Sequence, residues 1–133
     1  MARWLVSCAF VLAAAGAAHA HHSIAGYFDR SRQMTIDGVV AEFQFINPHP
    51  FLVVDVVQGR ARERWRLEMD NRGELASIGF TDATFKPGDR VVVVGSVARR
   101  EPRQMYIERL DRPTDGFSYE QVDNRPQLRP RAR

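Results

Sequence analysis

The sequence predicts an all-β protein, a small five-stranded OB-like barrel with a short helix between strands 3 and 4, preceded by a cleaved signal peptide. Short segments in which apolar and polar residues alternate predict half-buried strands. These segments follow the order of three strands, a short helical connection and two strands, which is the order of an OB-type barrel. Small sandwiches and other barrels share this order, so order alone does not distinguish them. The first twenty residues have the pattern of an export signal.

The predicted signal peptide covers residues 1–20. It has a positive start at Arg3, an apolar run from Trp4 to Ala15, and a small-residue cleavage site at Ala18-His19-Ala20. We expect cleavage after Ala20 and a mature protein that begins with His21 in the periplasm. The run is shorter than the roughly 20 apolar residues of a membrane span, and no later run is longer, so no stable span is expected in the mature form. The alternative is an uncleaved N-terminal anchor.

Composition predicts one domain without disulfides. The only cysteine, Cys8, lies in the signal, and about 110 mature residues suit one domain. The net charge is +3, but four arginines and two prolines fall within the last nine residues. Residues 113–133 are therefore predicted to be a flexible Arg/Pro-rich tail. Without it the body is close to neutral and lacks a basic stripe, so no nucleic-acid partner is expected.

The first predicted strand, Met34 to Phe45, opens the barrel domain at residues 34–112. Its apolar residues change parity, because Ile36 and Val40 occupy even positions whereas Phe43 occupies an odd one. Such a slip predicts a bulge or bend within one strand. Residues 21–33 before it form an N-terminal segment that carries His-His-Ser.

The second and third strands follow a proline-rich break at Asn47-Pro48-His49-Pro50. Phe51 to Val57 is rich in β-branched residues, which favour a strand. Arg62 to Asp70 alternates, with Trp65, Leu67 and Met69 on one face. The alternating carboxylates Glu42, Asp55 and Glu68 are interpreted as ordinary solvent-facing charges.

The remaining elements are a short helix and two strands. The helix is centred on Glu74-Leu75-Ala76 and closed by Gly79. The turn Lys86-Pro87-Gly88-Asp89 leads into a strand from Arg90 to Val97, whose consecutive valines predict burial. The last predicted strand is Gln104 to Leu110.

Several short motifs are spread along the predicted mature body. They are His21-His22-Ser23, Tyr27-Phe28-Asp29, Gly38-Val39-Val40, Phe45-Ile46-Asn47-Pro48-His49, Trp65 with Glu68, Gly79-Phe80, and Lys86-Pro87-Gly88-Asp89 with Gly95. Together they resemble an exported bacterial family catalogued as domain of unknown function 6152. The resemblance covers roughly residues 21 to 112, its paired His-His-Ser and Asn-Pro-His motifs are fairly specific, and the sequence departs from the pattern between Leu67 and Leu75. The resemblance implies an exported β-rich domain and no assigned activity.

Three histidines form a candidate metal site. A mature N-terminal His21 offers its amine and its ring nitrogen as a chelate, and His22 or His49 would add a second ring. A nitrogen-rich set of this kind suits copper, or less selectively zinc or nickel. The alternative is a terminus without a bound metal and a His49 that serves only the turn.

Trp65 and Met69 are weaker candidate ligands. Small periplasmic copper chaperones of the OB type hold Cu(I) with a histidine, methionines and a tryptophan face, and thioether ligands suit this soft ion. They share the apolar face of one strand, however, which favours a place in the core.

The sequence lacks the motifs of common enzymes. There is no G-x-S-x-G, no mature cysteine nucleophile, no phosphate-binding glycine loop and no H-E-x-x-H. The expected function is therefore non-enzymatic: metal binding through the histidines. The alternative is an OB-like module that binds a small ligand, a peptide or a cell-envelope partner without metal.

Overall fold

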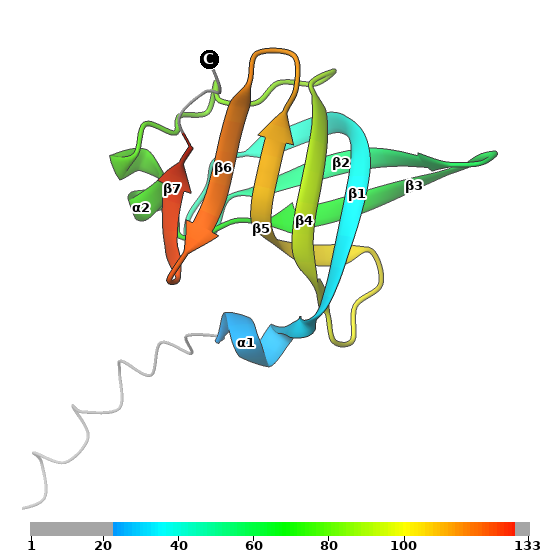
Figure 1. Ribbon diagram of the computed structural model, residues 1–133, viewed down its shortest axis with the longest axis horizontal. Coiled ribbons are helices and arrows are strands. Elements are labelled where there is room, and N and C mark those ends of the chain that lie inside the picture. Colours follow the sequence, from blue (N-terminus) through cyan, green and yellow to red (C-terminus); the bar gives the residue numbers. More distant parts are fainter. Residues whose placement is uncertain (1–22, 130–133) are drawn as a thin grey trace, which may run out of the picture.

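The computed structural model describes residues 23–129. The predicted signal peptide and both His21 and His22 lie outside the described residues. Two short helices and seven strands follow one another along the chain (Figure 1). Their bounds are α1 (Ile24–Tyr27), β1 (Phe28–Gln44), β2 (Phe51–Gln58), β3 (Ala61–Glu68), α2 (Arg72–Ser77), β4 (Arg90–Ala98), β5 (Gln104–Arg112), β6 (Phe117–Val122) and β7 (Arg125–Leu128).

The strands form one sheet with the order β3-β2-β1-β4-β5-β6-β7. Strand β1 is the longest and pairs antiparallel with both β2 and β4. A further, parallel pairing joins β3 to the first residues of β5. Residues 109–112 at the end of β5 pair antiparallel with β6. Strand pairing therefore runs from β1 through β2, β3, β5 and β4 back to β1, and β6 and β7 extend the sheet beyond β5.

The predicted irregularity in the first strand is confirmed. In the pairing of β1 with β2, Val40 lies opposite Val54 and Glu42 lies opposite Val53, so Ala41 is an extra residue. An extra residue exchanges the two faces of the strand beyond it. Ile36 and Val40 consequently point into the core before the bulge, whereas Phe43 packs against the core after it.

One main hydrophobic cluster forms the core of the domain. Its members come from β1 to β6, from α2 and from the connection that follows α2. Trp65, Leu67 and Met69 belong to it, as the alternation of β3 predicts. A smaller cluster of Phe28, Ala98 and Tyr106 lies outside it, with Ile24 of α1 packed against it.

The predicted short helix is α2. The Asn71 side chain caps it by accepting a hydrogen bond from the backbone N–H of Glu74, and Leu75 is buried. Gly79 follows with φ of +102°, a conformation that favours glycine.

The prediction of five strands and a flexible tail over 113–133 is wrong for residues 117–128. Tyr119 of β6 is fully buried, and Phe117 packs against the same core. Asp123 and Asn124 form a tight turn between β6 and β7 with φ of +50° and +59°, as a type I′ hairpin requires. The contacts of Phe117 and Tyr119 with the core stabilise this segment as strands, although its polar, proline-containing composition predicts a flexible tail.

None of the helices in the described part of the chain has the length and apolar character needed to cross a membrane.

Candidate functional site

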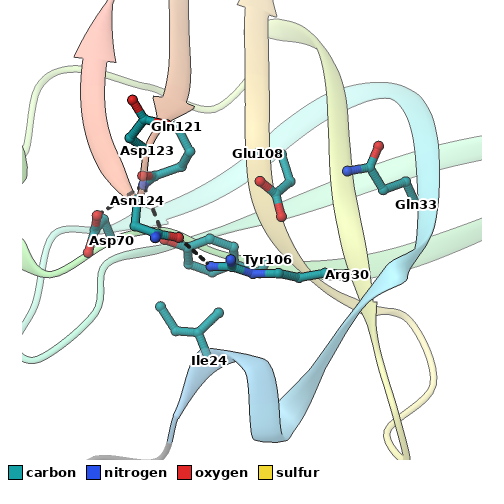
Figure 2. Close-up of a pocket in the computed structure, with 9 residues that line it drawn as sticks. All are labelled: Ile24, Arg30, Gln33, Asp70, Tyr106, Glu108, Gln121, Asp123 and Asn124. Carbon is teal, nitrogen blue, oxygen red and sulfur yellow. Dashed lines mark hydrogen bonds between the residues drawn. The ribbon is translucent and has the colours of Figure 1, made fainter.

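A cavity of about 380 Å³ is lined by residues of α1, β1, β5 and β6, of the connection between β3 and α2, and of the turn between β6 and β7 (Figure 2). We call it the polar pocket, because every lining side chain except Ile24 carries a polar group. Its lining residues come from several separate stretches of the chain. The lining residues are Ile24, Arg30, Gln33, Asp70, Tyr106, Glu108, Gln121, Asp123 and Asn124.

Irregular strand segments supply one side of the polar pocket. The register between β1 and β4 shifts between Asp29 and Gln33, and Arg30 lies in this unpaired stretch. In β5 the register shifts beside Glu108, which is the extra residue opposite Val94 and Gly95. Bulges redirect side chains and occur often beside functional sites.

The turn between β6 and β7 supplies the opposite side. Arg30 Nη2 donates a 2.7 Å hydrogen bond to Asn124 Oδ1 across the polar pocket (Figure 2). This bond joins the irregular part of β1 to the last hairpin. Both sides of the polar pocket are thus connected by a side-chain contact between residues far apart in the sequence.

Gln121 organises the floor of the polar pocket. Its Nε2 lies 3.0 Å from Asp70 Oδ2, 3.1 Å from Tyr106 Oη and 2.7 Å from Tyr119 Oη. An amide nitrogen carries only two hydrogens, so these three acceptors share them. Gln121 Oε1 is buried and has no hydrogen-bond partner. The network therefore lacks a donor for Gln121 Oε1, and a buried acceptor without a hydrogen bond costs free energy.

The two floor tyrosines keep their protons. Burial raises the pKa of Tyr106 and of Tyr119 far above the ordinary range, and the nearby carboxylate of Asp70 acts in the same direction. Both hydroxyls therefore remain neutral hydrogen-bonding groups at any physiological pH.

Carboxyl groups outnumber cations around the polar pocket. Asp70 is only 7% exposed and accepts hydrogen bonds from Gln121 and from the backbone N–H of Asn71. Glu108 accepts a 2.8 Å hydrogen bond from the hydroxyl of Ser96, which is fully buried. With Asp123, three carboxyl groups face the single guanidinium of Arg30. This charge balance favours a cationic group in the cavity.

His49 lies outside the polar pocket, beside the strand that leads to Asp70. Its ring is half-buried, and Nδ1 lies 3.1 Å from the backbone carbonyl oxygen of Met69. When Nδ1 carries the proton it donates to this carbonyl, and Nε2 is left as a metal-coordinating atom. Ligating histidines are commonly oriented by such a bond.

Glu68 is a carboxylate whose charge interacts with that of His49. Burial raises the pKa of Glu68, while the charges of His49 and Arg66 act in the opposite direction. The interpretation of Glu68 as an ordinary solvent-facing charge is corrected, because the side chain is half-buried. Glu42 is exposed, and Asp55 pairs with Arg64.

The start of the described chain lies close to this region. Ile24 packs against the small cluster that contains Tyr106, and Tyr106 is paired with Glu68 where β5 runs parallel to β3. His21 and His22 lie outside the described residues. Only Ser23 separates His22 from Ile24 in the sequence.

Trp65 and Met69 are placed in the core. Met69 is fully buried, and its backbone carbonyl oxygen lies 3.1 Å from His49 Nδ1. The indole N–H of Trp65 donates to Glu63 over 3.3 Å. Between residues 23 and 129, no group of three or more His, Cys, Asp or Glu side chains is arranged to hold a metal ion.

Sequence reasoning missed the polar pocket. Asp70 was assigned to the end of a strand, Tyr106 to the middle of another, and Gln121 to the tail. Two local signals pointed to irregular backbone: the turn-forming pair Asp123-Asn124, and Glu108 between the apolar residues Ile107 and Leu110.

One comparison with known proteins finds a match. The profile of the family of unknown function DUF6152 matches residues 9–105, well over half of the chain. Searches of curated proteins and of solved structures give no match.

Proposed function

The chain belongs to the DUF6152 family, and we propose that it is an exported, non-enzymatic binding module that holds a small cationic ligand in the polar pocket. The observation that carries this proposal is a cavity lined by three carboxyl groups and one guanidinium, with an unpaired buried acceptor on Gln121 beside it. A primary amine supplies both the positive charge and the N–H donors that such a lining favours.

The proposed scaffold is an OB-like barrel. The pairing of β1 with β2 and β4, together with the parallel pairing of β3 with β5, supports a closed five-stranded arrangement. The position of α2 between β3 and β4 agrees with this topology. On this proposal β6 and β7 are an addition that builds one side of the polar pocket.

The proposed location is the periplasm. It is supported by the charged start, the apolar run and the Ala-His-Ala site of residues 1–20. An exported module without disulfides depends on its apolar core alone for stability, and the main cluster supplies such a core.

The test of the pocket uses Glu108→Gln and a matched control. The amide keeps the size of the side chain and can accept from Ser96, but it removes one negative charge. We expect 1,4-diaminobutane to bind the exported protein and Glu108→Gln to weaken this binding about tenfold, or ~1.4 kcal/mol. Glu101→Gln, at an exposed position outside the polar pocket, should leave the affinity unchanged.

Isothermal titration calorimetry measures these affinities, with glucose and acetate as neutral and anionic probes. Binding of glucose or acetate in preference to the diamine would contradict the cationic specificity. An equal loss in Glu101→Gln would show that the diamine responds only to net charge.

We propose metal binding as a second candidate function. The supporting observation is the contact of His49 Nδ1 with the Met69 carbonyl, which leaves Nε2 for coordination. His21 and His22 would supply the remaining nitrogens, and a nitrogen-rich set suits copper, with zinc as the alternative.

Intact mass and copper content of protein purified after export test this second candidate. We expect a mass that begins at His21 and about one copper per chain, with the metal lost in His49→Ala. Protein that begins at His21 and takes up no copper would eliminate the metal site without affecting the proposal for the polar pocket.

A further inference from the structure

A second cavity of about 300 Å³ lies beside β3, away from the lining of the polar pocket. Its lining contains three arginines and no carboxylate. We call it the basic cleft and define it by Arg64, Arg66 and Arg103, with Trp65, Pro102 and Gln104 beside them.

The fold brings these arginines together from two parts of the chain. Arg64 and Arg66 are two residues apart on β3, so their side chains leave the same face of the strand. Arg103 directly precedes β5, which runs parallel to β3. The backbone N–H of Arg66 donates a 2.9 Å hydrogen bond to the carbonyl of Arg103, which fixes the two residues side by side.

Arg103 has an unusual backbone conformation. Its φ is +53°, in the left-handed region that residues other than glycine, asparagine and aspartate rarely adopt. A residue held in this region costs free energy, and such residues concentrate at binding sites.

Two of the three guanidinium groups remain available. Arg64 donates from Nε and Nη2 to the carboxylate of Asp55 at 2.8 and 3.1 Å, so its charge is compensated. The guanidinium of Arg66 lies over the ring of Phe51, with Cζ 3.6 Å from the ring centroid. Stacking of this kind orients a guanidinium while leaving its N–H edge free. Within residues 23–129, neither Arg66 nor Arg103 forms an ion pair.

Glu68 lies on the same face of β3 as Arg66, and burial raises the pKa of Glu68 while the charge of Arg66 lowers it. Within residues 23–129 the two side chains form no ion pair, and Glu68 is outside the lining of the basic cleft. Val53 and Pro102 add apolar surface, which lowers the competition from water for any charged group bound between the arginines.

We propose that the basic cleft binds the phosphate group of a ligand between Arg66 and Arg103. Two guanidinium forks that form no ion pair among residues 23–129 match a doubly charged oxyanion in both charge and hydrogen-bonding geometry. The phosphate belongs either to a soluble phosphate ester or to the headgroup of an anionic phospholipid, and the experiment separates these sources.

Inorganic phosphate is titrated into the ¹⁵N-labelled full chain, and the amide signals of Arg66, Arg103 and Gln104 are followed. We expect saturable shifts at these residues. Arg66→Gln and Arg103→Asn should each weaken phosphate binding about fivefold or more. Asparagine is chosen at position 103 because it tolerates the left-handed conformation, so the variant loses the charge and keeps the backbone.

Arg62→Gln is the matched control. Arg62 is on the same face of β3 and carries the same charge, but it lies outside the basic cleft. Its loss should change the affinity less than twofold, because a single exposed charge is screened by solvent. An equal effect of Arg62→Gln, or an absence of shifts at the cleft residues with both phosphate and vesicles, would overturn the proposal.

Vesicles identify the source of the phosphate group. Sedimentation with phosphatidic acid vesicles that is lost in Arg66→Gln would assign the basic cleft to a lipid headgroup. Phosphate-induced shifts without sedimentation would assign it to a soluble ester. Vesicles of phosphatidylcholine alone control for binding to a neutral bilayer surface.

Discussion

Gly95 lies where β4 comes closest to β5. A Cβ atom at this position would lie 2.3 Å from the carbonyl oxygen of Tyr106 and 3.0 Å from the sulfur of Met105. The carbonyl cannot move freely, because Gly95 and Ile107 are paired in the sheet. We expect Gly95→Ala to lower the free energy of unfolding by about 3 kcal/mol or more, since it forces strands apart in a packed core.

Urea unfolding measures this effect, and Gly73→Ala is the matched control. Gly73 lies in α2, where an added Cβ would meet only the side chain of Asn71 at 3.4 Å. There the substitution should change stability by less than about 1 kcal/mol, with stabilisation expected from the reduced freedom of the unfolded chain. Equal stability of the two variants would contradict the close approach of β4 and β5.

The pair of Asp55 and Arg64 gives a prediction for pH dependence. The hydrogen bonds from Arg64 lower the pKa of Asp55 below its ordinary value of 3.8, while burial acts in the opposite direction. A group whose pKa is lower in the folded state stabilises the fold above the unfolded pKa, and this stability is lost as the pH falls through the folded pKa. Asp55→Asn should therefore be less stable than the parent at pH 7, with the difference vanishing well below pH 3.8.

Urea unfolding across this pH range checks the prediction. The loss at neutral pH should be small, because the guanidinium of Arg64 is largely exposed to solvent. Arg64→Gln should reproduce it, since both variants remove the pairing of opposite charges between Asp55 and Arg64. A difference that persists at acid pH would show that the Asp55 side chain acts through packing and not through its charge.

At the scale of elements, local patterns predicted most of the strands. The β-branched residues of β2 and the valines of β4 indicate strands without reference to the rest of the chain. The change of parity between Val40 and Phe43 even predicted a bulge or bend within the first strand, because a buried face constrains the register, and the structure has the extra residue at Ala41.

The same reasoning failed for β6 and β7. Only Phe117, Tyr119 and Val122 are apolar in β6, so the segment has too little alternation to indicate a strand by itself. Its stability comes from neighbours that are distant in the sequence: Tyr119 packs edge-to-face on Phe80, with ring centroids 5.6 Å apart. Tertiary contacts of this kind cannot be inferred from composition.

Tyr119 tests whether β6 is part of the core. Tyr119→Ala should lower the free energy of unfolding by about 3–5 kcal/mol, because it leaves a large cavity beside Phe80. Tyr119→Phe keeps the ring and loses the hydrogen bond with Gln121, so a cost of about 1 kcal/mol is expected. Chemical unfolding measures both.

Leu128→Ala on β7 is the control for the last hairpin. Leu128 is 42% exposed, so its truncation should cost less than about 1 kcal/mol. If Tyr119→Ala were no more destabilising than Leu128→Ala, residues 117–128 would not contribute to the core.

At the scale of the whole molecule, the polar pocket depends on elements that meet only in the folded chain. Its residues range from Ile24 to Asn124, and Arg30 and Asn124 are in direct hydrogen-bond contact. No local pattern relates these positions, because the register shifts in β1 and β5 decide which side chains converge. The histidines carry a stronger local signal in the sequence, because His49 has a proline on either side and His21 follows the predicted cleavage site.

The shared core makes a prediction about cooperativity that hydrogen exchange can test. Tyr119 of β6 and Val93 of β4 belong to the same hydrophobic cluster. Opening β6 therefore exposes the core, and we expect its paired amides to be protected within about 1 kcal/mol of those in β4. The β2–β3 hairpin should exchange faster at its tip, where Val57 is 65% exposed. Native-state exchange followed by NMR measures these protections for each residue. If the β6 amides exchanged as fast as those near Val57, the last hairpin would open independently of the rest of the sheet. One side of the polar pocket would then open and close while the remaining domain stayed folded.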